Sequence, residues 1–284
     1  MDRAATRETG VDDKPAPIVI KRQSIWTRLT HWVWVICLFF LLLTGLQIFN
    51  AHPTLYIGQQ SGFEFSNSIF SISAQYKPDG SIGGYTTIFG NTFETTGFLG
   101  YSGPEGQERV RGFPAWMTIP SYQDLATGRV VHFFFGWLLV ATMFVWFLAS
   151  FVNGHLRRDI IPTGTDMRAL PGDIAEHARF KFRHRRRYNV LQKLSYGIVL
   201  LILFPLIVLT GLTMSPGMDA AWPWLVDLFG GRQTARTIHF IVMVLLVVFF
   251  IVHVVMVLVA GPINTMRSMI TGRYRIDPET EVEK

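Results

Sequence analysis

Four histidines inside apolar stretches are the residues of this sequence best suited to chemistry. Two of them, His239 and His253, lie fourteen residues apart in the run from 237 to 261. A helix rises about 1.5 Å and turns about 100° per residue, so these rings lie about 21 Å apart along the axis and within about 40° of one face. One ring therefore lies near each side of a bilayer. The other two, His31 and His132, lie in separate apolar stretches.

These histidines form two pairs of matching depth. His31 lies near the start of the first stretch and His253 near the end of the fourth, so both lie near one membrane face. His132 and His239 each lie a few residues into the second and fourth stretches, which both enter from the opposite face. The remaining histidines fall in connecting loops: His52, His155, His177 and His184. Two level pairs of imidazoles on facing helices suit two haem irons, each held by two axial nitrogens, as in electron-transferring b-type haems.

Other cofactors fit this pattern less well. Zinc takes three or four ligands, and no carboxylate or thiolate lies at either depth. The single cysteine, Cys37, cannot by itself form an intrachain disulfide, a thiolate zinc site or an iron–sulfur cluster. A proton relay through the histidines would not explain their pairing.

Glycines recur in phase with the histidines. Gly45 follows His31 by fourteen residues, Gly197 and Gly211 are also fourteen apart, and Gly136 lies one turn after His132. A residue without Cβ lets a helix approach the edge of a flat porphyrin. Glycine also packs membrane helices together, but the shared phase favours haem packing.

Four apolar stretches are long enough to position these residues across a membrane. The sequence is 49% hydrophobic and only 16% charged, and residues 25–49, 130–152, 191–214 and 237–261 each approach or exceed the roughly 20 apolar residues that a bilayer requires. Pro205 interrupts the third stretch, which we expect to be kinked. The fold class predicted is an all-α integral membrane protein, a bundle of four transmembrane helices.

The basic residues predict how this bundle is oriented. The segment 153–187 carries nine lysines and arginines against four acidic residues and is expected in the cytoplasm, with both termini. Residues 179–187 then act as a topology anchor, and no nucleic-acid partner is expected. The polar start of the chain argues against a signal peptide. We expect cytoplasmic tails at 1–24 and 262–284, a membrane domain at 25–261, and a periplasmic loop at 50–128.

Four motifs resemble the di-haem cytochrome b subunits of bacterial nickel–iron hydrogenases, formate dehydrogenases and thiosulfate reductases. They are "RLTHWVWVICLFFLLLTG" (28–45), "RVVHFFFGW" (129–137), "YNVLQKLSYG" (188–197), and His239 with His253 in the fourth helix. The resemblance implies an inner haem b ligated by His31 and His253 and an outer one ligated by His132 and His239. It also implies quinone as a substrate near the inner haem, at Asn189, with Tyr188 and Gln192 as further candidates.

Three arginines precede predicted ligands by three residues: Arg28, Arg129 and Arg236. A guanidinium binds carboxylates well, so each could pair with a haem propionate. Each could equally anchor a helix end at the membrane surface.

The loop 50–128 is long for a connection and rich in phenylalanine, tyrosine, glycine and serine. Loops of this length are often functional. We expect it to form short helices or turns on the membrane surface that cover the outer haem and help to dock a partner. Cytochromes of the resembled kind are often coupled to a periplasmic molybdopterin oxidoreductase.

The sequence therefore predicts a multi-pass cytochrome of the bacterial inner membrane that moves electrons between a periplasmic redox protein and the quinone pool. Substrate catalysis would belong to another subunit. One alternative is a stand-alone enzyme that acts on a small species such as superoxide, although the outer loops are net acidic. Another is a haem-free transporter or signalling module, although the apolar stretches lack aspartate and glutamate. The direction of electron flow, the quinone type and the oligomeric state, homo-oligomers included, stay open.

Overall fold

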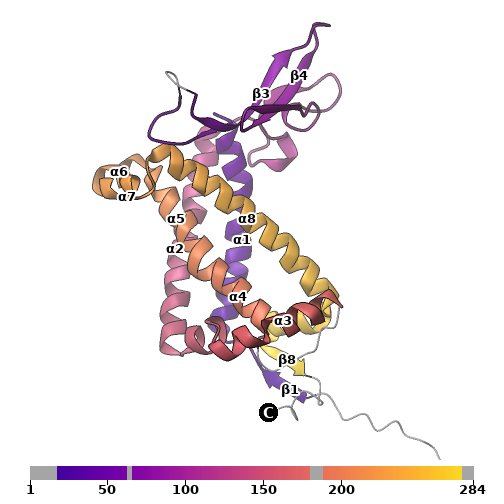
Figure 1. The fold of residues 1–284 in the computed structure, drawn as a ribbon, viewed down its shortest axis with the longest axis vertical. Helices are drawn as coiled ribbons and strands as arrows, with labels where there is room; N and C mark the ends of the chain where they lie inside the picture. The colour runs from indigo at the N-terminus through magenta and orange to yellow at the C-terminus, as the bar shows by residue number, and fades with distance from the viewer. Residues whose placement is uncertain (1–17, 63–65, 180–187, 277–284) are drawn as a thin grey trace, which may run out of the picture.

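The computed structural model describes residues 18–62, 66–179 and 188–276. Within these ranges, four helical spans are long and apolar enough to cross a membrane, and they stand together as a bundle (Figure 1). They are Ile25–Phe49 (α1), Leu125–Val152 (α2), Val190–Thr213, and Arg232–Val259 (α8). The prediction of a helical membrane protein is confirmed, and each predicted stretch falls on one span.

The third span is irregular where the sequence has proline. It consists of α4 (Val190–Ile198), a π-helical turn η3 (Val199–Leu203) and α5 (Phe204–Thr213). Pro205 has no N–H to donate, and its ring crowds the carbonyl four residues earlier. The chain opens just before it, and the Phe204 N–H donates to the Val199 carbonyl, five residues back. The span continues through the proline.

Aromatic side chains fill the middle of the bundle. Trp34 of α1 is buried, and its indole N–H donates to Thr142 Oγ1 on α2 at 3.0 Å. Its ring packs against Trp146 of α2 and Phe204 of α5, with centroids 5.8 and 5.4 Å away. This packing joins three of the four spans between the two histidine depths.

One end of the bundle, here called the sheet end, carries β-strands (Figure 1). A four-stranded antiparallel sheet is ordered β2 (Thr54–Tyr56), β3 (Ser68–Tyr76), β4 (Ile82–Ile88) and β5 (Asn91–Glu94). Strands β6 (Gly100–Ser102) and β7 (Arg109–Arg111) pair separately, and the 3-10 turn η1 (Ala115–Met117) leads toward α2. Helices α6 (Pro216–Ala221) and α7 (Pro223–Leu228) lie at the same end.

These strands correct two expectations: that the fold is all-α, and that the loop 50–128 forms short helices or turns. Residues 68–76 and 82–88 are rich in isoleucine, threonine, tyrosine and phenylalanine, which favour strands. Between them lies Asp79–Gly80, a strong hairpin signal, and Gly80 has a positive φ of 85°. The strand-forming residues and the turn between them therefore explain why this connection forms a sheet.

The opposite end, here called the tail end, brings the flanks of the chain together. Strand β1 (Ile18–Lys21) pairs antiparallel with β8 (Arg273–Ile276), and Ile18 faces Ile276. Helix α9 (Pro262–Thr271), the π-turn η2 (Leu156–Ile160) and helix α3 (Gly164–Ala178) lie at this end too. The segments expected as tails are therefore partly ordered elements. Of the basic run 179–187, only Arg179 is among the described residues.

Candidate functional site

The bundle brings the four membrane histidines together as two pairs. His31 on α1 faces His253 on α8 at the tail end, and His132 on α2 faces His239 on α8 at the sheet end. The ring centroids are 6.4 Å apart in both pairs. Helix α8 thus contributes one ring to each level, as the fourteen-residue spacing requires.

This spacing fits an iron between the rings. A metal–imidazole bond of about 2 Å on each side, with each nitrogen about 1 Å from its ring centre, separates the centroids by about 6 Å. No third histidine, cysteine or carboxylate joins either pair within the described residues. Two imidazoles are the donor set that completes a porphyrin iron at its axial positions.

At the sheet end, neighbouring helices contact both imidazoles closely. Thr44 Oγ1 on α1 lies 3.0 Å from His132 Nδ1, and Thr210 Oγ1 on α5 lies 3.1 Å from His239 Nδ1. The next residues, Gly45 and Gly211, are so close that a Cβ on either would stand 3.3 Å from the ring Cε1. Both rings of this pair are therefore positioned by a threonine and a glycine.

The tail-end pair has a different environment. His31 Nδ1 is buried and lacks a hydrogen-bond partner among the described residues. The Trp32 ring meets the His31 ring edge-on at 5.3 Å, and the His253 ring stacks on Phe249 at 5.6 Å. Aromatic rings thus pack against both imidazoles, and neither ring hydrogen-bonds to another of the described residues.

The glycines singled out in the sequence do not share one environment. Gly45 and Gly211 approach histidine rings, whereas a Cβ at Gly136 would be 4.0 Å from Leu41 Cδ2. A Cβ at Gly197 would be 3.7 Å from the Ile160 carbonyl oxygen. The Cβ positions of these last two glycines therefore face other protein segments, and neither contacts a histidine ring.

The three arginines contact backbone carbonyls and aromatic rings. Arg28 donates to the Ile270 carbonyl at 2.6 Å, and its Nε is buried without a partner in the described part of the chain. Arg129 lies over the Phe133 ring at 5.7 Å. Arg236 donates to the carbonyls of His52 and Thr54. The unpaired Nε of Arg28 fits an anionic group such as a propionate, whereas Arg236 holds the strand β2 against α8.

An apolar cluster of the sheet end lies beside the outer histidines. Buried Phe49 of α1, Leu55 of β2 and Ile72 of β3 pack together with Phe113 and with Phe240 of α8. Phe240 directly follows His239 in the chain. The sheet is thus packed onto the bundle where the His132–His239 pair lies.

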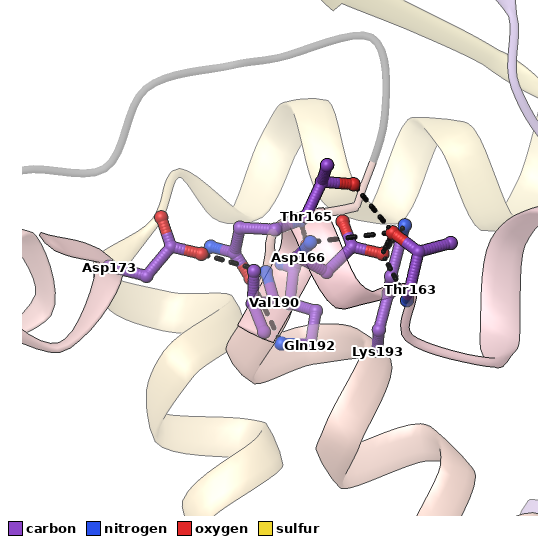
Figure 2. Close-up of polar contacts among 8 residues, drawn as sticks. Thr163, Thr165, Asp166, Asp173, Val190, Gln192 and Lys193 are labelled. Carbon is purple, nitrogen blue, oxygen red and sulfur yellow. Dashed lines mark hydrogen bonds and ion pairs between the residues drawn. The ribbon is translucent and has the colours of Figure 1, made fainter. Parts of the chain in front are cut away.

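The residues nominated for quinone lie at the start of the third span, at the tail end. Asn189 Oδ1 accepts from the Gln192 N–H at 2.9 Å, and Gln192 Oε1 accepts from the Asn189 N–H at 3.4 Å, which is a capping box for α4. Capping uses the side-chain oxygens, so it leaves the Gln192 amide N–H groups as donors. Figure 2 shows this junction, with Asp173 accepting from the Val190 N–H at 2.7 Å.

Tyr188 has partners that sequence reasoning missed. Its hydroxyl accepts from Gln23 Nε2 at 2.6 Å, and the Arg22 guanidinium lies 4.7 Å from its ring centroid. Gln23 is buried, and its Oε1 has no partner among the described residues. Nothing in the sequence marked Gln23, because it lies in a polar flank that reaches Tyr188 only through the fold.

Comparisons with known proteins match this chain to a family of cytochromes. The family described as prokaryotic cytochrome b561 matches residues 115–272, more than half of the chain. The putative protein-methionine-sulfoxide reductase subunit YedZ1 of Azospira oryzae is 25% identical over 249 residues, covering 87% of this chain and 94% of the relative. No solved structure gives a significant match.

Proposed function

Since this chain belongs to the prokaryotic cytochrome b561 family, we propose that it carries electrons across a bacterial inner membrane with two haems b, between a periplasmic redox protein and the quinone pool. The observation that carries the proposal is the recurrence of one histidine geometry, with centroids 6.4 Å apart, at two depths. When bound, each haem supplies a one-electron iron couple. The chain supplies the four axial nitrogens.

The sidedness we propose places the sheet end in the periplasm and the tail end in the cytoplasm. Basic residues beside membrane helices favour the cytoplasm. Arg157, Arg158 and Arg168 lie at the tail end, and β1 and β8 bring both flanks of the described chain to that same end. The outer pair, His132 and His239, then lies nearer the periplasm.

We place quinone chemistry at the start of α4, near the inner pair. A quinone ring needs hydrogen-bond donors at the membrane edge, and the Gln192 amide and the Tyr188 hydroxyl lie in this region with Asn189. Arg28, Arg129 and Arg236 remain our candidates for propionate partners, with Arg28 best supported by its unpaired buried Nε.

We propose that the periplasmic partner is an oxidoreductase that docks on the sheet end. The relative in Azospira oryzae is named a subunit of a putative protein-methionine-sulfoxide reductase, so reduction of oxidised methionine is the partner reaction we favour. A molybdopterin enzyme is the partner class we expect. The sheet would cover the outer haem and present the docking surface.

Optical spectra of the purified protein, oxidised and then reduced with dithionite, test the haem proposal. With pyridine-haemochrome quantification we expect two haems b per chain. The number should fall to one in His31→Ala and in His132→Ala. His52→Ala is the control, because His52 bonds Tyr56 outside both pairs, and it should retain two. Fewer than two haems in the folded wild-type protein would contradict the proposal.

A further inference from the structure

We propose that Thr44 and Thr210 are positioning residues that hold the outer imidazoles by accepting a hydrogen bond from Nδ1–H. Each ring then presents Nε2 to the space between the pair. The inference rests on the proposed function, in which His132 and His239 ligate the outer haem. It adds that these two threonines make the outer ligands stronger electron donors.

The direction of these hydrogen bonds follows from the single proton of each hydroxyl. Thr44 Oγ1 donates to the Phe40 carbonyl at 2.6 Å, and Thr210 Oγ1 donates to the Leu206 carbonyl at 2.7 Å. Both threonines are fully buried, at 0% exposure. With its proton committed to the preceding turn, each hydroxyl can only accept from the ring. In this arrangement the ring nitrogen at 3.0 or 3.1 Å carries the hydrogen. The Leu41 and Ile207 backbone carbonyls also accept from the His132 and His239 rings.

The same device occurs at two unrelated places in the chain. The sequence Leu-Thr-Gly-Leu stands at 43–46 on α1 and again at 209–212 on α5. In both copies the glycine Cβ position lies 3.3 Å from Cε1 and 3.7 Å from Nδ1 of the facing ring. The glycine admits the ring to the helix backbone, and the threonine before it supplies the acceptor. Such a repeat is hard to attribute to helix packing alone.

The inner pair lacks this arrangement among the described residues. His31 Nδ1 is buried without a partner there. An acceptor on Nδ1–H raises the basicity of the ligating nitrogen, and a more basic ligand favours ferric over ferrous iron. The threonines should therefore lower the midpoint potential of the outer haem and leave the inner haem unaffected.

Isosteric variants of the full-length protein test this inference. Thr44→Val and Thr210→Val keep the side-chain shape, remove the hydroxyl acceptor and leave the backbone carbonyls in place. Redox titration followed by visible spectra should show two haems, with the outer midpoint raised. We expect up to about a tenfold rise in the ferrous-to-ferric ratio at fixed potential, or about 59 mV for one electron. The same substitutions in a His31→Ala background identify the outer haem.

Two further variants separate the hydrogen bond from packing. Thr30→Val is the matched control, because Thr30 is also buried on α1 and donates to the Trp26 carbonyl at 2.8 Å, but its hydroxyl makes no hydrogen bond to a histidine ring of the described residues. It should leave both potentials unchanged. The valine variants should also change the low-spin ferric EPR signal of the outer haem. Thr44→Ser keeps the hydroxyl, so its outer midpoint potential and its EPR signal should match those of the wild-type protein.

The possible results distinguish a failure of the threonine inference from a failure of the proposed function. Two haems with unchanged potentials and EPR signals in the valine variants would overturn the inference and leave the proposed function intact. Equal haem loss in Thr44→Ser and Thr44→Val would also overturn it, since packing would then be the role. Fewer than two haems in the wild-type protein would instead contradict the proposed function.

Discussion

Each imidazole of the outer pair packs against a glycine so closely that a Cβ atom on that glycine would crowd the ring. A Cβ at Gly45 or Gly211 would stand 3.3 Å from a ring carbon, closer than an ordinary contact. We predict that Gly45→Ala and Gly211→Ala displace the ring and cost about 1–3 kcal/mol through overpacking. Haem content per chain and thermal unfolding in detergent measure both effects, and the outer haem should be the one weakened.

Gly136→Ala is the control for this prediction. A Cβ there meets only Leu41 Cδ2 at 4.0 Å, an ordinary contact. Alanine is also the better helix former. Full haem content and unchanged or higher stability are expected, and equal losses in all three variants would show that the ring contacts are not the cause.

At the scale of elements, an ion pair between Asp166 and Lys193 joins α3 to α4. Asp166 Oδ2 lies 2.8 Å from Lys193 Nζ, and the Thr163 backbone N–H also donates to it at 2.8 Å (Figure 2). Lys193 is only 7% exposed. The hydrogen bond from Lys193, followed by that from Thr163, lowers the pKa of Asp166 to about 2.

A lowered carboxyl pKa stabilises the fold above the pKa of the unfolded chain. The unfolded value is about 3.9, so the contribution is complete above about pH 4 and is lost as the pH falls toward about 2. We predict that Asp166→Asn destabilises the protein by about 1–2 kcal/mol at pH 7, because Lys193 is left buried without its partner. The variant should also lose this part of the acid dependence.

Thermal unfolding followed by tryptophan fluorescence between pH 7 and pH 3 measures both effects. Asp227→Asn serves as the control, since Asp227 is exposed on α7. It should match the wild-type protein throughout this range. An Asp166→Asn curve that parallels the wild-type curve at all pH values would show that the ion pair contributes nothing to the acid dependence.

At the scale of the whole molecule, the two ends differ in chemistry. The sheet end is built from polar and aromatic strands, and the tail end gathers the basic residues around α3, α9 and the β1–β8 pair. We predict that, in a Cys37→Ser background, Ser81→Cys in the β3–β4 turn reacts with a membrane-impermeant maleimide in cells with a permeabilised outer membrane. Ala169→Cys on α3 should react only after the inner membrane is lysed.

The background variant is suitable because Cys37 is buried and is the single cysteine of the sequence. Cys37→Ser without a new cysteine should remain unlabelled before and after lysis. Labelling of Ala169→Cys but not Ser81→Cys in unlysed cells would reverse the proposed sidedness. It would also move the quinone site and the partner to the opposite faces.

Much of this arrangement was determined by sequence alone, because its signals are local. Apolar runs of sufficient length predict the spans, and the helical repeat fixes the relative depth of His239 and His253. His31 could be paired with His253, and His132 with His239, because helices of similar length cross the same bilayer. The composition of residues 68–88 and their Asp79–Gly80 hairpin signal are local too, and they favour strands over helices and turns.

Only the tertiary structure decided the contacts between distant segments. Pairing of β1 with β8, the reach of Gln23 to Tyr188, and the placing of Thr44 and Thr210 on histidines of other helices all depend on which faces meet. The capping box of Asn189 and Gln192 was visible as a spacing, but its role emerged only with the start of α4. Helical periodicity specifies depth and face, whereas rotation and approach between helices come from side-chain packing across the whole bundle.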